Sequence, residues 1–142
     1  MTDPTPASDD GADPAGTVTA FELLGGEPRV RALVDRFYDL MAMDERFAGI
    51  LALHPQPLDG SRDKLFWFLC GWLGGPDHYI ERFGHPRLRA RHLPFPIASA
   101  ERDQWLLCMA EAMADLEVPQ PLFDRLLASF SNTADWMRNR AG

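Results

Sequence analysis

The chain has 142 residues, of which 46% are hydrophobic and 11% aromatic, and its formal net charge is −7. This length and composition predict one globular domain with a packed core. The negative net charge argues against a general nucleic-acid-binding protein, which needs a basic face to bind phosphates. No run of about 18 apolar residues occurs in the sequence, so no membrane-spanning helix is predicted.

Residues 1–18 are predicted to be a disordered acidic tail ahead of the domain. Their aspartates and prolines have no basic partner, and such a segment cannot bury enough apolar surface to offset its ordering entropy. These residues are Asp3, Asp9, Asp10 and Asp13, with Pro4, Pro6 and Pro14. The tail has neither a cationic start nor an apolar run, so we do not expect a signal peptide. Cys70 and Cys108 show no metal-ligand spacing, and the sequence predicts a reduced, cytoplasmic protein.

Hydrophobic periodicity predicts a long helix from Pro28 to about Met41. Proline suits a first helical position, and apolar side chains then recur at the i, i+3, i+4, i+7 spacing of a helix with one buried face. These apolar residues are Val30, Leu33, Val34, Phe37, Tyr38 and Met41. Asp44 is expected to cap a short second piece that runs to about Leu51. The prolines of His54-Pro55-Gln56-Pro57 end it.

The next helix is expected to start at Asp59 or Ser61 and to end before Gly74-Gly75-Pro76. Its apolar residues cover more than one stripe, which predicts a largely buried helix. They are Leu65, Phe66, Phe68, Leu69, Trp72 and Leu73. Residues 77–98 are predicted to be irregular, with short helical turns around 79–83 and 88–92.

Two more helices complete the predicted fold, which is all-α because no two-residue alternation occurs. Ser99 is expected to cap a helix to about Leu116, and its apolar middle, residues 105–110, predicts burial on every side. The last helix begins near Pro121. A domain of this kind has room for a flat ligand between helices. An ordinary bundle with a filled core accounts equally well for the composition.

His92 is the candidate metal ligand. It follows the basic run Gly84-His85-Pro86-Arg87-Leu88-Arg89-Ala90-Arg91. Neutral imidazole is the commonest protein metal ligand, and one histidine can hold haem iron. Neighbouring guanidinium groups can pair with porphyrin carboxylates. A histidine in such a place is more often a surface or hydrogen-bonded core residue, so both alternatives stand at this point. No Cys-x-x-Cys-His motif occurs, which excludes covalent haem attachment.

From about Phe21 to Arg140 the sequence resembles the truncated haemoglobins of group II. The matching motifs occur in the family's order and at similar spacing. They are Leu24-Gly25-Gly26, Asp35-Arg36-Phe37-Tyr38, Trp72-Leu73-Gly74-Gly75-Pro76, the run Gly84–His92, Pro94-Phe95 and Glu101-Arg102-Asp103-Gln104-Trp105. The resemblance implies that residues 19–142 form a shortened globin fold, a two-over-two helical sandwich around non-covalent haem b.

The resemblance also implies the roles of the axial and distal residues. His92 would be the proximal iron ligand. Tyr38 and Trp105 would direct hydrogen-bond donors at a bound diatomic molecule, although both also suit plain core packing. His54 would lie against the distal haem edge, and a surface cap at the helix end is its alternative.

The remaining pocket residues come from the resemblance as well. The distal walls would be Leu65 and Phe68, and Ser61 would stand at the gate. The haem propionates would be held by Lys64 and Arg91, with Tyr79 as a third contact.

Three residues lie outside these assignments. Trp67 is off the main apolar stripe of its helix, which predicts either a partner-facing patch or a cover for the end of a neighbouring helix. His78 and His85 have no ligand-like context, so they are expected at the surface or in loops.

Three functional hypotheses follow. The first is a haem protein that reversibly binds dioxygen and other diatomic ligands at five-coordinate iron in a polar distal pocket, as a monomer or a homodimer. The second is a haem enzyme that oxidises nitric oxide or uses peroxide and depends on a separate reductase. The third is a cofactor-free helical interaction module, since fold alone does not fix function. No residue is assigned a catalytic role.

Overall fold

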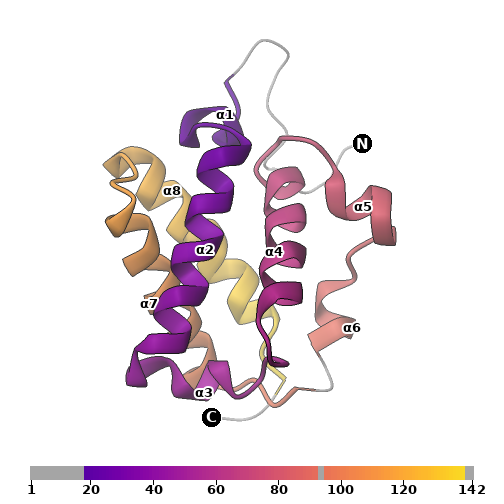
Figure 1. Ribbon diagram of the computed structural model, residues 1–142, viewed down its shortest axis with the longest axis vertical. Helices are drawn as coiled ribbons and strands as arrows, with labels where there is room; N and C mark the ends of the chain where they lie inside the picture. The colour runs from indigo at the N-terminus through magenta and orange to yellow at the C-terminus, as the bar shows by residue number, and fades with distance from the viewer. Residues whose placement is uncertain (1–17, 93–94, 140–142) are drawn as a thin grey trace.

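The computed structural model describes residues 18–92 and 95–139. The predicted acidic tail, apart from Val18, lies outside the described residues (Figure 1). The side chains of Arg89 and Arg91 also lie outside the described part.

Within the described residues the regular structure is helical and no strand occurs, which confirms the predicted all-α class. The elements are α1 (Ala20–Leu24), α2 (Glu27–Met43), the 3₁₀ helix η1 (Glu45–Phe47), α3 (Ala48–Leu51), α4 (Asp59–Trp72), α5 (His78–Phe83), α6 (Leu88–His92), α7 (Ser99–Asp115) and α8 (Gln120–Trp136). In the described part of the chain, none of these helices is long and apolar enough to cross a membrane.

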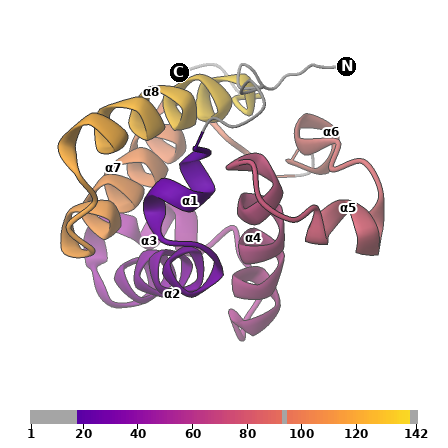
Figure 2. The ribbon, with the colours of Figure 1, turned by 90° about the horizontal axis from the view of Figure 1, so that it is seen from above.

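Two pairs of long helices form the body of the fold. α2 packs against both α4 and α7, and α7 packs against α8. Figure 1 shows α2 and α4 side by side, with α8 crossing behind them. Viewed from above, the short helices α5 and α6 lie beyond α4, on its side away from α2 (Figure 2). α4 therefore lies between α2 and the segment that carries His92.

α2 gives one whole face to the core, as its periodicity predicts. All six predicted apolar positions, Val30, Leu33, Val34, Phe37, Tyr38 and Met41, are buried. Cys70 of α4 and Cys108 of α7 are fully buried as well, and the thiol of Cys108 donates to the carbonyl oxygen of Phe37 at 3.2 Å. Both cysteines are free and serve as small buried hydrophobic residues, as predicted.

Arg62 joins α4 to α2 through two carboxylates. Its guanidinium group donates to Asp39 at 2.8 Å and to Asp35 at 3.2 Å. These acidic groups are partly exposed, so each pair contributes at most about 1 kcal/mol. The pairs fix the rotation of the first turns of α4 more than they stabilise the fold.

Helix α1 is absent from the sequence prediction. Thr19 and Glu22 form a capping box, with both backbone-to-side-chain distances at 3.1 Å. The amide of Phe21 donates to the carbonyl of Leu73 at 2.9 Å, which ties α1 to the end of α4. Five residues are too few for a periodicity to appear, and the Thr-x-x-Glu pattern was the available signal.

Two predictions for α7 are wrong. Ser99 is not the N-cap: Ala98 holds that position, and its amide donates to the carboxylate of Glu101 at 2.8 Å. The hydroxyl of Ser99 instead accepts from Arg138 at 3.2 Å. Burial on every side also fails, because Leu107 is 45% exposed. One side of α7 faces solvent because the elements that pack on it, α2, α8, α3 and η1, cover only part of its circumference.

The burial pattern predicts the cost of emptying the core. Leu33→Ala should lower the free energy of unfolding by about 2–5 kcal/mol, because Leu33 is fully buried and its removal leaves a cavity. Leu23→Ala is the matched control, since Leu23 is 51% exposed on α1. Urea denaturation of both variants measures the difference. Equal losses in the two variants would contradict the packing described above.

Candidate functional site

His92 ends the short helix α6, and its ring is held by the backbone of that same helix. Its Nδ1 lies 2.7 Å from the carbonyl oxygen of Leu88. A carbonyl only accepts, so Nδ1 carries the hydrogen and the neutral ring leaves its lone pair on Nε2. This tautomer and this fixed orientation are what a histidine needs to ligate a metal. The sequence pattern did not reveal Leu88 as the acceptor.

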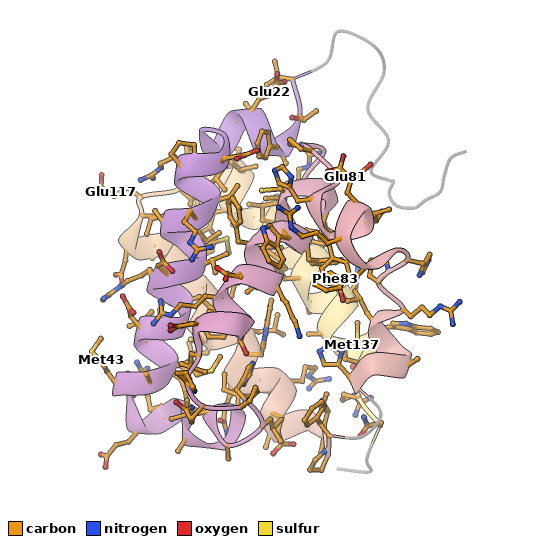
Figure 3. The ribbon with its side chains drawn as sticks, turned by 45° about the vertical axis from the view of Figure 1, so that its right-hand side comes forward. Glu22, Met43, Glu81, Phe83, Glu117 and Met137 are labelled. Atoms are coloured by element: carbon orange, nitrogen blue, oxygen red, sulfur yellow. The ribbon has the colours of Figure 1, made fainter. Side chains whose placement is uncertain are left out.

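Asn139 holds the backbone that follows His92. Its side-chain amide donates to the carbonyl of His92 at 3.1 Å and to the carbonyl of Phe95 at 3.0 Å. The side-chain oxygen of Asn139 accepts a hydrogen bond from the backbone amide of Ile97 at 3.0 Å. The backbone amide of Asn139 donates to the backbone carbonyl of Ile97 at 2.8 Å. Figure 3 labels Met137, where the chain leaving α8 approaches α6. Asn139 was not singled out in the sequence because it lies beyond the last helix, where no periodicity operates.

His54 follows α3 and is half-buried. Its Nδ1 lies 2.8 Å from the carbonyl oxygen of Ile50, so its Nε2 is also left with a lone pair. Burial lowers the pKa of His54, the hydrogen bond to Ile50 opposes the shift, and the charge that His92 can carry adds to it. His54 is therefore neutral at pH 7.

Tyr38 reaches the same region from α2. Its ring meets His54 edge-on, with centroids 5.6 Å apart, and Phe37 at 5.0 Å. Burial raises the pKa of the Tyr38 phenol well above 10, and the positive charge of Arg62 only partly offsets this. The hydroxyl group therefore keeps its proton at every physiological pH and can act as a donor.

Trp105, on α7, joins this cluster through a shared neighbour. Its ring lies 5.2 Å from that of Phe37 and 5.5 Å from that of Phe130. Phe37 thus touches both Tyr38 and Trp105, which brings the two predicted donors into one aromatic cluster. Both rings pack against the core, as the packing interpretation predicts, and their role as donors stays a prediction.

The predicted α4 residues share one face of that helix. Ser61, Lys64, Leu65 and Phe68 are spaced i, i+3, i+4 and i+7, which places them one above the other. Lys64 is exposed and the other three are half-buried. The prediction that α4 is largely buried is wrong, since Phe66 and Trp72 are also only half-buried. No helix of the described bundle covers this apolar surface completely.

The other predicted contacts lie around the α5–α6 segment. Tyr79 of α5 meets Phe68 edge-on, with centroids 6.3 Å apart. The side chain of Arg91 lies outside the described residues. His85 is exposed, as expected, whereas His78 is not a simple surface residue. It is half-buried, and its Nε2 lies 2.8 Å from the Glu27 carboxylate.

These residues fit haem. Among the described residues, no group of three His, Cys, Asp or Glu side chains converges on a common point. A metal held by His92 therefore needs its other ligands from a carrier, and a porphyrin supplies them. The half-buried apolar face of α4 suits one side of such a flat group.

Comparisons with known proteins agree with this arrangement. Residues 19–139 match the family described as bacterial-like globin. The group 2 truncated hemoglobin YjbI of Bacillus subtilis (strain 168) is 43% identical over 105 residues, which are 71% of this chain and 77% of that protein.

Solved structures give the same result. A cold-adapted truncated hemoglobin from the Antarctic marine bacterium Pseudoalteromonas haloplanktis aligns with a TM-score of 0.83 and 48% identity, covering 87% of this chain and 99% of that chain. A group II 2-on-2 hemoglobin from the plant pathogen Agrobacterium tumefaciens aligns with a TM-score of 0.85 and 43% identity, covering 90% and 98%. The predicted two-over-two globin fold is thereby confirmed. The chain belongs to the bacterial-like globins and, within them, to the group II truncated haemoglobins.

Proposed function

We propose that the protein binds haem b non-covalently through His92 and uses it to bind dioxygen and other diatomic ligands reversibly at five-coordinate iron. The observation that carries this proposal is the bond between Nδ1 of His92 and the Leu88 carbonyl, which leaves Nε2 free to ligate. When bound, haem iron supplies one axial position for that nitrogen and a second for a small ligand.

The distal side chains decide how tightly a ligand is held. A diatomic ligand that gathers negative charge is stabilised by neutral donors in a site that excludes water. The Tyr38 phenol and the Trp105 indole are such donors. A hydrogen bond to a charged group is worth about 1.5–3 kcal/mol, or about 10- to 150-fold in affinity. Two donors in one pocket favour slow release, which suits scavenging or redox chemistry better than bulk transport.

The other predicted residues complete the proposed site. Leu65 and Phe68 would wall the pocket, and the small side chain of Ser61 would leave its entrance open. Lys64 would pair with a haem propionate near the exposed end of the α4 face, and we extend the same role to Tyr79 and Arg91.

Haem-dependent redox chemistry is the second candidate function, with nitric oxide or peroxide as substrate and a separate reductase as electron donor. The feature that favours it is the contact of Tyr38 with the neutral imidazole of His54, because polar groups in a pocket can assist proton transfer. The buried free thiols of Cys70 and Cys108 suit the reducing, cytoplasmic setting that we propose.

Removal of the proximal ligand tests the primary proposal. His92→Ala should lose most of the Soret absorbance after reconstitution with haem, because no other described side chain replaces the axial ligand. Adding imidazole should restore part of it. His85→Ala is the control, since His85 is exposed in the same segment. A normal ferrous–carbon monoxide spectrum in His92→Ala would rule out this assignment.

Loss of the indole donor should speed ligand release. Trp105→Phe keeps the ring against Phe37 and Phe130 but removes the N–H group, so the oxygen dissociation rate should rise about 10- to 150-fold. Stopped-flow displacement of oxygen by carbon monoxide measures this rate. Trp136→Phe is the control, because Trp136 is 65% exposed on α8. An unchanged rate in Trp105→Phe would remove Trp105 from the list of donors.

Asn139 should matter for haem retention although it lies outside the pocket. Asn139→Ala removes the bonds to the carbonyls of His92 and Phe95, which loosens the support of the iron ligand. Haem transfer to an excess of an apo-globin acceptor should become about 10- to 100-fold faster, as for other groups that orient a metal ligand. Asn132→Ala, on the exposed side of α8, should leave this rate unchanged. Equal rates in the two variants would contradict the role given to Asn139.

A further inference from the structure

The side chain of Gln104 reaches from α7 to the backbone of α3, which packs against α7 (Figure 1). Its amide oxygen accepts a hydrogen bond from the backbone amide of Ile50 at 3.1 Å. Amides in the first turn of a helix generally lack a partner within that helix, and Ile50 is the third residue of α3. Phe47, at the N-cap of α3, makes no side-chain capping bond. Gln104 therefore supplies, from another helix, an acceptor that α3 lacks at its own N-cap.

Gly49 makes this close approach possible. A Cβ atom at position 49 would lie 2.8 Å from both Oε1 and Nε2 of Gln104, which is closer than a side chain tolerates. The missing side chain of Gly49 and the long side chain of Gln104 therefore match each other across the contact between α3 and α7. A methyl group at this position would displace the flexible amide end of Gln104 rather than the helix backbone.

Ile50 connects Gln104 to His54. The backbone carbonyl of Ile50 accepts a hydrogen bond from Nδ1 of His54 at 2.8 Å. The amide and the carbonyl of one residue flank the same Cα atom, so fixing the amide of Ile50 also constrains the direction of its carbonyl. A helix as short as α3, Ala48–Leu51, is not stable by itself. The contact from Gln104 therefore helps to determine where the acceptor for His54 lies.

The bond to Ile50 selects the tautomer of His54. The carbonyl only accepts, so the hydrogen lies on Nδ1 and the lone pair on Nε2. Burial lowers the pKa of His54, which keeps the ring neutral at pH 7. In this state Nε2 can accept a hydrogen bond but cannot donate one. A neutral imidazole that is not held exchanges between two tautomers, and the other tautomer carries an N–H group on Nε2.

We propose that Gln104 is a positioning residue that holds His54, through Ile50, in the tautomer that offers the pocket an acceptor and no donor. This inference rests on the proposed haem site and deepens it, because it leaves Tyr38 and Trp105 as the groups that donate to a bound diatomic ligand. α7 then serves the site twice, since Gln104 and Trp105 are consecutive residues of that helix.

Removal of the acceptor oxygen tests the proposal in the full-length, haem-loaded protein. Gln104→Leu keeps a side chain of similar size, and the ring of His54 becomes free to donate from Nε2 to bound oxygen. The oxygen dissociation rate at pH 7 should therefore fall about 2- to 10-fold. A role in packing alone predicts the opposite sign, because a loosened pocket admits water and releases oxygen faster. A faster or unchanged rate would overturn the inference.

A double-mutant cycle tests whether the effect passes through His54. His54→Phe keeps a ring beside Tyr38 but has no nitrogen, so adding Gln104→Leu to it should leave its oxygen dissociation rate unchanged. A further change in that background would contradict the proposal, because Gln104 would then act by another route. Gln120→Leu is the control for the loss of a glutamine amide, since Gln120 is exposed at the start of α8, and it should release oxygen at the wild-type rate.

Two more variants and a spectroscopic measurement test the contacts themselves. Gly49→Ala should displace the amide of Gln104 and slow oxygen release as Gln104→Leu does, whereas Gln104→Glu keeps an acceptor oxygen. Nuclear magnetic resonance of the ¹⁵N-labelled ferrous–carbon monoxide form, which is diamagnetic, reads the tautomer of His54. The hydrogen should lie on Nδ1 in the wild type and in Gln104→Glu, and partly on Nε2 in Gln104→Leu and Gly49→Ala. A hydrogen on Nε2 in the wild type would refute the assignment.

The Soret spectrum of each variant distinguishes failure of this inference from failure of the haem site. A wild-type chain that takes up no haem overturns the proposed function and this inference with it. If haem is bound, the dissociation rates and the tautomer of His54 decide the inference and leave the haem site standing. If Gln104→Leu alone loses haem, Gly49→Ala provides the same comparison, because it breaks the contact with Ile50 and leaves the side chain of Gln104 in place.

Discussion

The hydrogen bond between His92 and the carbonyl of Leu88 is the interaction on which the proposed site depends. It determines that Nε2 is the ring nitrogen left free to ligate a metal. α6 is only five residues long and cannot hold its own orientation by helix propensity. The bonds from Asn139 to the carbonyls of His92 and Phe95 supply that rigidity from the far end of the chain.

Stability and ligand binding are assigned to different surfaces of the same helices. α2 buries its whole apolar face against α7 and α4, and this core maintains the fold. On α4, by contrast, part of the apolar face is not covered by the core, because Leu65 and Phe68 are only half-buried. Burying such surface is favourable by about 25 cal/mol per Å². An apolar face left partly uncovered would therefore give a flat apolar cofactor a favourable free energy of binding, to which the proposed axial bond of His92 would add.

Sequence reasoning succeeded where a repeated pattern carries the information. The buried face of α2 follows from its period, and α5 and α6 lie almost where short turns were predicted. Sequence reasoning failed where a single tertiary or capping contact determines the local structure. The cap of α7 depends on Glu101 reaching the amide of Ala98, which no spacing rule separates from capping by Ser99. Asn139 and the Leu88 carbonyl act on His92 through the folded backbone, so neither has a sequence signature.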